Sequence, residues 1–242
     1  MKTTFVKTGI CIMMAAALLA SCKKSGPTYV TASSSQLSMG IKADNAITPL
    51  NATNATALNS SPQTSAMVTF TSGIANISGF KFEARKKGLQ IEVQSRGLST
   101  IDLFAINPTM IGITLDTGTY TEIELRVEFT KSSTATLPLV LKGTFTTTSG
   151  TVIPVEFDLN DNAEVKVEQH DAVVDGKTNL TNVVMLHLNK LLTGVSPADL
   201  SAATQTNGTI IISSSSNNSI YKRILDNLSS CGDSNGFEHH DR

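Results

Sequence analysis

Alternation of apolar and polar residues is the feature that most limits how this chain can fold. It is clearest where Ile123, Leu125, Val127 and Phe129 alternate with charged residues. Successive side chains of a β-strand point to opposite faces, so this pattern indicates a strand with one buried face and one wet face. Such one-sided burial is typical of antiparallel sheets.

Similar patterns recur along most of the chain from Ala66 onward, and turn residues separate them at short intervals. Regularly spaced short strands with such turns are typical of a β-sandwich. We therefore predict an all-β domain over residues 66–228, an antiparallel β-sandwich of about nine strands with a short C-terminal helix. The alternation is carried by residues 67–71, 80–82, 89–93, 111–115, 123–129, 137–145, 152–159, 163–167 and 180–188.

The spacing becomes helical near the end of the chain. Apolar residues recur at intervals of three and four between Ile220 and Leu228, which predicts a short amphipathic helix. Before it, Ser196 and Pro197 are expected to start a helix of one or two turns, because Ser is favoured at the N-cap and Pro at the first helical position. Residues 229–242 are predicted to be a polar tail.

The first residues have the features of a bacterial lipoprotein signal. A basic start precedes an uncharged stretch that is shorter than the roughly 20 apolar residues needed to span a bilayer. Leu19-Ala20-Ser21-Cys22 then matches a lipobox, in which small residues precede the cysteine that carries the lipid. We predict that residues 1–21 are a signal peptide and that lipid on Cys22 holds the chain to a membrane. The alternative is an ordinary secretory signal in which Cys22 has no part.

Residues 22–65 are rich in Ser, Thr, Ala and Asn. A segment with few bulky apolar groups buries too little surface to offset its ordering entropy. We therefore expect a lipidated N-terminus followed by a flexible tether. The alternative is that Tyr29–Thr31 or Leu37–Ile41 forms a first strand.

Composition narrows the possible partners and chemistry. The chain has 19 Lys and Arg against 20 Asp and Glu, without the basic excess typical of nucleic-acid-binding proteins, so no nucleic-acid partner is expected. Of the three cysteines, Cys11 leaves with the signal and Cys22 carries lipid, so Cys231 has no partner for an intrachain disulfide. The sequence has no Gly-rich phosphate loop and no His-Glu-x-x-His or Cys-x-x-Cys motif. We expect no enzymatic activity and no cofactor.

Asp158, Asn160 and Asn162 form the pattern closest to a metal site. Their spacing resembles the start of a Ca²⁺ loop, in which alternate oxygen ligands converge on the ion. Ala163 replaces the glycine of that loop, and Gln169 stands where a bidentate glutamate is needed. A polar turn is therefore favoured over calcium binding.

The histidines offer weaker candidates. His187 lies in an apolar strand pattern and His170 at the end of a strand pattern, so structural roles are favoured for both. Glu238-His239-His240-Asp241 could hold a divalent ion, but adjacent histidines in a tail are not preorganised. A solvated tail is favoured there.

Several segments together resemble a known group of proteins. They are Val68–Gly73, Phe80–Ala84, Gly118–Tyr120 and Ile211–Tyr221, together with Ser21–Lys24. These resemble uncharacterised Bacteroidota lipoproteins whose domains of unknown function are thought to be prealbumin-like or fimbrillin-like β-sandwiches. The resemblance covers roughly residues 1–228. It implies a β-sandwich and carries over no functional residue.

These observations predict a lipid-anchored cell-envelope protein with a non-catalytic structural, adhesive or protein-binding role. Its partner would be the membrane, through Cys22, and another envelope protein or a second copy of itself. The alternatives are a ligand-binding lipoprotein, for glycan or Ca²⁺, and an envelope hydrolase. The absence of Trp ranks glycan below protein contact. The resemblance implies the outer membrane, and Lys23–Gly26, which lack an acidic residue, favour its periplasmic face over the cell surface.

Overall fold

The computed structural model describes residues 33–50 and 65–241. The predicted signal peptide, Cys22 and Tyr29–Thr31 lie outside these residues. Over the described residues the chain forms fifteen strands and three helices. The strands are β1 (Ser34–Asp44), β2 (Ile47–Pro49), β3 (Met67–Lys86), β4 (Leu89–Asp102), β5 (Ile111–Asp116), β6 (Gly118–Phe129), β7 (Leu139–Thr146), β8 (Val152–Leu159), β9 (Ala163–Gln169), β10 (Ala172–Val174), β11 (Thr178–His187), β12 (Gln205–Thr206), β13 (Thr209–Ile212), β14 (Gly232–Ser234) and β15 (Glu238–Asp241). The helices are α1 (Leu188–Leu191), α2 (Pro197–Ser201) and α3 (Asn218–Leu228).

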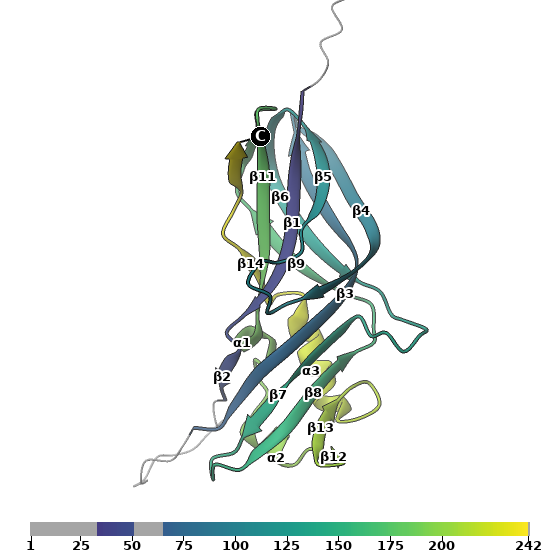
Figure 1. The fold of residues 1–242 in the computed structure, drawn as a ribbon, viewed down its shortest axis with the longest axis vertical. Helices are drawn as coiled ribbons and strands as arrows, with labels where there is room; N and C mark the ends of the chain where they lie inside the picture. Colours follow the sequence, from purple (N-terminus) through teal and green to yellow (C-terminus); the bar gives the residue numbers. More distant parts are fainter. Residues whose placement is uncertain (1–32, 51–64, 242) are drawn as a thin grey trace, which may run out of the picture. The chain divides into compact units, whose positions relative to one another are not determined.

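The strands form two mixed sheets (Figure 1). The smaller sheet has the order β14-β11-β1-β5, and β15 pairs with another part of β11. β1 is antiparallel to β5 but parallel to β11, with Leu37 opposite Leu180. The prediction of a mostly β domain is confirmed. The prediction of purely antiparallel sheets is wrong, since β13 also runs parallel to β8, and the strands outnumber the nine that were expected.

The larger sheet is organised by β3, a strand of 20 residues. The first half of β3 pairs with β2 and β7, and its second half pairs with β6. β4 pairs with β3 from Ile74 to Lys86. Three shifts in register interrupt these ladders, one of them between Phe70 and Ser72. Such irregularities bend a strand and increase its twist, so β3 can contribute to both halves of the sheet.

One apolar core joins the two sheets. The alternating side chains expected at Ile123, Leu125, Val127 and Phe129 are all buried, so the prediction for this strand is confirmed. They belong to one cluster with apolar side chains of β1, β3 and β11. Because burial of apolar surface is the main favourable contribution to folding, this shared cluster holds the two sheets together.

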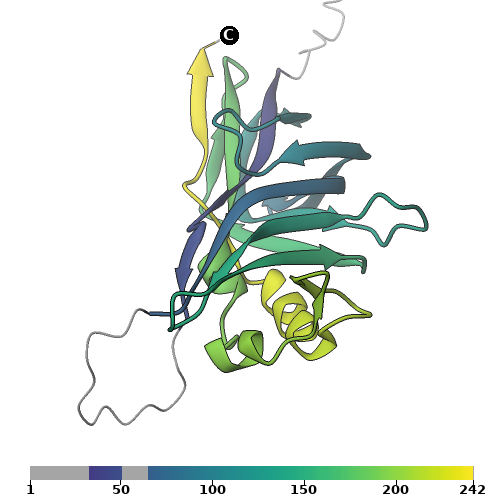
Figure 2. The same ribbon diagram turned by 60° about the horizontal axis from the view of Figure 1, so that its bottom comes forward.

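α3 lies against β9 and β13, at the lower end of the molecule in Figure 2, and α1 contacts β2 and α3. The apolar stripe of α3 is buried, as its spacing predicts, and the Tyr221 ring lies 5.8 Å from the Phe157 ring. α2 begins with a capping box between Ser196 and Asp199, with Pro197 as its first residue. The predictions for both helices are confirmed.

The tether prediction is wrong where the structure describes the segment. Ser34–Asp44 is a strand with neighbours on both edges, and Leu37, Met39 and Ile41 are fully buried. These three residues alternate with small or polar ones, which is enough to place one face of a short strand in the core. The alternative of a strand at Leu37–Ile41 is therefore confirmed.

The prediction of a polar tail over residues 229–242 is also wrong. β14 and β15 both pair with β11, and the Cys231 side chain is fully buried. A strand at the margin of a sheet is held by backbone hydrogen bonds, so it does not need the apolar side chains on which the prediction relied.

Candidate functional site

The amide oxygens of the proposed calcium loop are used within the protein. Asn160 Oδ1 accepts a hydrogen bond from the backbone N–H of Ser132 at 2.8 Å, and Asn162 Oδ1 accepts one from Lys131 N–H at 2.8 Å. Both donors belong to the loop between β6 and β7. The two asparagines therefore hold that loop against the end of β8, which agrees with the expectation of a polar turn.

Asp158 lies near the end of β8, opposite Val140 of β7. Its Oδ1 is buried and has no hydrogen-bond partner within the described part of the chain. Burial, followed by the negative charge of Glu156, raises the pKa of the Asp158 carboxyl to about 6. Among the described residues, no three His, Cys, Asp or Glu side chains are grouped so that they could hold a metal ion.

The raised pKa makes a testable prediction for Asp158→Asn. Because the folded pKa lies above the unfolded value of about 3.9, ionisation of this carboxyl lowers the free energy of unfolding. This loss is absent below about pH 3.9, grows as the pH rises toward and through 6, and then stays constant. The variant should therefore raise the free energy of unfolding at pH 8 by about 1 kcal/mol, allowing for solvent screening, and change it little at pH 4. Urea denaturation at both pH values measures this difference. Asp171→Asn, at an exposed site, is the matched control, and an equal effect of Asp158→Asn at both pH values would contradict the prediction.

His187 connects three strands of the smaller sheet. Its Nδ1 lies 2.7 Å from Asp44 Oδ1, and its Nε2 lies 3.6 Å from Asp233 Oδ2. Its backbone N–H donates to the carbonyl of Cys231. These contacts support the structural role that the sequence favours. The carboxylates were missed because Asp44 and Asp233 lie in segments interpreted as tether and tail.

Cys231 is a poor candidate for a nucleophile. Its side chain is fully buried, and its Sγ donates to the Leu228 carbonyl at 3.0 Å. Burial raises the pKa of the thiol to about 12. Since the thiolate is the reactive form, a thiol that stays protonated in the core acts as a small apolar group.

The remaining histidine candidates lie near the C-terminal strand. His170 and His239 line a cavity of about 280 Å³ together with Phe237. His239 Nδ1 lies 3.1 Å from Thr178 Oγ1, and His240 Nε2 lies 3.8 Å from Glu238 Oε2. All four residues of β15 are exposed. The segment expected to be a solvated tail is therefore solvated but ordered as a strand.

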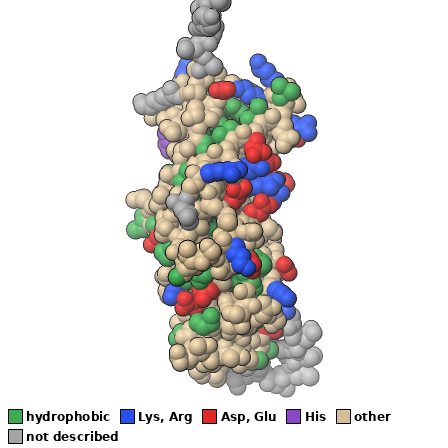
Figure 3. Space-filling model, turned by 90° about the vertical axis from the view of Figure 1, so that its right-hand side faces the viewer, with side chains coloured by type: hydrophobic (Ala, Val, Ile, Leu, Met, Phe, Trp, Pro, Cys, Tyr) green, Lys and Arg blue, Asp and Glu red, His purple; other side chains and the backbone are tan. Residues whose placement is uncertain are grey.

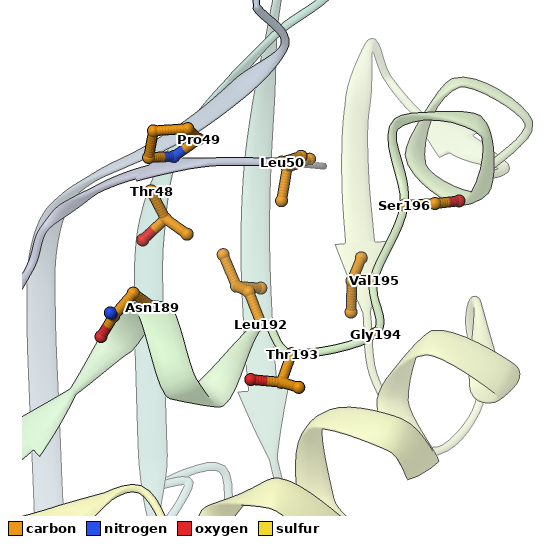
Figure 4. Close-up of a pocket in the computed structure, with 9 residues that line it drawn as sticks. All are labelled: Thr48, Pro49, Leu50, Asn189, Leu192, Thr193, Gly194, Val195 and Ser196. Atoms are coloured by element: carbon orange, nitrogen blue, oxygen red, sulfur yellow. The ribbon is translucent and has the colours of Figure 1, made fainter. Parts of the chain in front are cut away.

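Two of the other cavities among the described residues bear on the candidate functions. One, of about 320 Å³, lies beside α1, and the side chains of Leu50 and Leu192 project toward each other in it (Figure 4). Ser196 also lines this cavity, and its hydroxyl donates to Asp199 Oδ2 at 2.8 Å within the capping box of α2. The other cavity, of about 530 Å³, is bounded by the loop between β6 and β7. Most of the residues that line it have hydroxyl or amide side chains: Asn76, Ser78, Thr130, Ser132, Ser133, Thr134 and Thr136, with Lys131 and Pro138.

A network of ion pairs crosses the outer face of four adjacent strands. Lys81 of β3 lies 3.2 Å from Glu92 of β4, and Arg126 of β6 lies 3.3 Å from Glu164 of β9. Hydrogen bonding to Glu83 raises the pKa of Lys81. The other pairs are Lys81–Glu83, Glu83–Arg126, Arg126–Glu124 and Glu124–Lys166. Figure 3 shows acidic and basic side chains gathered together on one side of the molecule. The sequence predicted that the charges of β6 face outward, but not which charges they pair with.

No protein-family model, curated protein or solved structure matches this chain. The similarity to Bacteroidota lipoproteins therefore stays a prediction from the sequence segments that carry it. None of the described helices has the length and apolar character needed to cross a bilayer.

Proposed function

We propose that this chain is a lipid-anchored protein of the cell envelope whose β-sandwich domain has a non-catalytic structural, adhesive or protein-binding role. Lipid on Cys22 would attach it to the outer membrane, with the domain on the periplasmic face. Its partner would be another envelope protein or a second copy of the chain.

The non-catalytic role is supported by the contacts that the candidate catalytic and metal-binding side chains already make within the protein. His187 lies between two carboxylates, Asn160 and Asn162 hold a loop, and the Cys231 thiol is buried. A general base or nucleophile must instead reach a substrate with its reactive atom. Side chains engaged in these contacts support a domain that acts through its surface.

The position of β1 changes the role expected for the tether. Its first residue is Ser34, so only residues 23–33 separate it from Cys22. A chain of that length spans at most about 40 Å even when fully extended. A domain anchored in this way would stay near the membrane surface, which favours partners in or close to the same membrane.

Glycan binding is the second candidate, and the hydroxyl-lined cavity beside the loop between β6 and β7 favours it. Thr130, Ser132 and Thr134 offer both donors and acceptors there, as a sugar requires. All three of these hydroxyls already have partners within the protein: Thr130 Oγ1 lies 2.9 Å from Ser78 Oγ, and Ser132 Oγ lies 2.9 Å from Thr134 Oγ1. We therefore rank this function below protein contact.

The test uses the full-length chain expressed in bacterial cells. We expect the detergent-purified protein to show no turnover on ester, glycoside and peptide panels, and cross-linking in intact cells to recover one defined envelope protein or the chain itself. Turnover that is lost in His170→Gln or His187→Gln would instead support a hydrolase. Binding on a glycan array that is lost in Ser133→Ala, a lining residue of the cavity, but kept in Ser149→Ala, an exposed residue outside its lining, would support the second candidate.

A further inference from the structure

β4 is a long strand with one edge left unpaired. It spans 14 residues and pairs only with β3 among the strands that the structure describes. In Figure 1 it lies at the outer margin of the larger sheet. An unpaired edge presents a row of backbone N–H and C=O groups, which are a template for another strand.

The turn before β4 shows which backbone groups face outward. Lys87 and Gly88, with φ of 52° and 78°, form a two-residue turn, and Lys86 pairs with Leu89 across it. In such a hairpin the flanking residues form a hydrogen-bonded pair, and hydrogen-bonded positions then alternate along the ladder. The residues of β4 whose N–H and C=O point away from β3 are therefore Gln90, Glu92, Gln94 and Arg96.

The charges at this edge have opposite signs on the two sides of Gln94. Glu92 pairs with Lys81 through one carboxylate oxygen, and about half of its side chain stays exposed, at 51%. The Nε of Arg96 donates to Gln94 Oε1 at 2.8 Å, and Arg96 is an exposed residue. An antiparallel copy centred on Gln94 would place each Glu92 opposite the other copy's Arg96. A parallel copy in register would place like charges side by side.

We propose that β4 is a self-association surface at which a second copy of this chain pairs antiparallel about Gln94. Opposite charges directly across two strands stabilise their pairing, and the two-fold arrangement forms both Glu92–Arg96 pairs at once. On the other face of the strand, Leu89 is 70% exposed, and Ile91 and Val93 are only partly buried. These side chains add apolar surface that the second copy would cover.

The pairing is expected to be weak in solution and stronger at a membrane. A single pair of strand edges buries less surface than the roughly 1,600 Å² of a standard protein interface. Attachment of both copies to one membrane raises their effective concentration. The higher effective concentration at the membrane rests on the lipid anchor of the proposed function. The self-association deepens that function by naming a second copy of the chain as the partner.

Cysteine cross-linking in cells that express the full-length chain tests the register. With Gln94→Cys, a short bis-maleimide should give a product of twice the monomer mass, because the two Gln94 positions would lie opposite each other. With Gln90→Cys the two cysteines would be eight residues apart along the strands, about 27 Å, and should not react. The unsubstituted chain, with Cys231 buried, shows any background from Cys22. Equal yields at both positions, no product at Gln94→Cys, or a product of another mass would overturn the proposal.

Charge exchange provides a second test that does not depend on the cysteine position. In the Gln94→Cys chain, Glu92→Arg should lower the cross-linked fraction about tenfold, because it places two positive charges opposite each other. Adding Arg96→Glu should restore the cross-linked fraction, because opposite charges then face each other again. The repulsion between residue 92 and Lys81 is the same in both variants, so it does not account for the recovery. A double variant that does not recover, while its protease resistance shows that it is folded, would overturn the pairing. Fatty-acid labelling of the same samples reports the anchor separately, so failure of the pairing is distinguishable from failure of the proposed function.

Discussion

Cys22→Ala is expected to abolish lipid labelling of this chain and to leave residues 1–21 attached. The thiol of Cys22 is the acceptor in the predicted lipobox Leu19-Ala20-Ser21-Cys22. Without it, no thioether can form, and the cleavage that follows lipidation is blocked. Incorporation of an alkyne fatty acid and the mass of the intact protein measure both effects. The stretch before Cys22 is apolar and would remain in the variant, so membrane fractionation alone is a weaker measure.

Cys11→Ala is the matched control, since it makes the same substitution within the predicted signal peptide. It should keep both the label and the cleavage. The lipobox interpretation would be wrong if Cys22→Ala stayed labelled, or if both variants were cleaved at the same site without lipid.

The parts of the fold that the sequence predicted are those in which local pattern and burial agree. Ile123–Phe129 alternates without interruption, and all of its apolar residues lie in the core. β7 and β8 were predicted in the same way, from the alternation of residues 137–145 and 152–159, and the structure pairs them antiparallel. In such segments the period of two determines which face is buried, whatever the neighbouring strands are.

β1 was predicted only as an alternative to the tether, because its position depends on a distant partner. Its pairing with β11 joins Leu37 to Leu180, far apart in the sequence, and the parallel arrangement leaves no hairpin turn to reveal it. Ser34, Ser35 and Ser38 within it suggested a solvated segment. What places it in the sheet is tertiary pairing on both edges, which overrides weak local preference.

The candidate site was predictable only in part. Asn160 and Asn162 were correctly expected in a polar turn, but the loop whose N–H groups they accept could not be read from their spacing. The same holds for His187, whose carboxylates come from β1 and β14. Contacts of this kind depend on which strands become neighbours, and no local pattern in this chain encodes that.

Gly143 is a position at which the next larger residue should strongly destabilise the domain. It lies in β7 opposite Phe70 of β3, beside the register shift between Phe70 and Ser72. A Cβ atom at this position would lie 2.1 Å from the Thr69 carbonyl oxygen and 2.8 Å from the Phe70 Cα. Both are backbone atoms, so the clash cannot be relieved by turning a side chain. Glycine within a strand often marks such a close approach of two backbones.

Gly143→Ala must therefore push β3 and β7 apart, and β3 is the strand that connects both halves of the larger sheet. Overpacking typically costs 1–3 kcal/mol, and a backbone clash at a central strand should reach about 3 kcal/mol. For a domain of this size that corresponds to a fall in melting temperature of roughly 10 °C. Thr144→Ala, at the next residue of the same strand, is the control and should cost less than about 1 kcal/mol. Equal unfolding midpoints for the two variants would show that β7 does not approach β3 as closely as the structure places it.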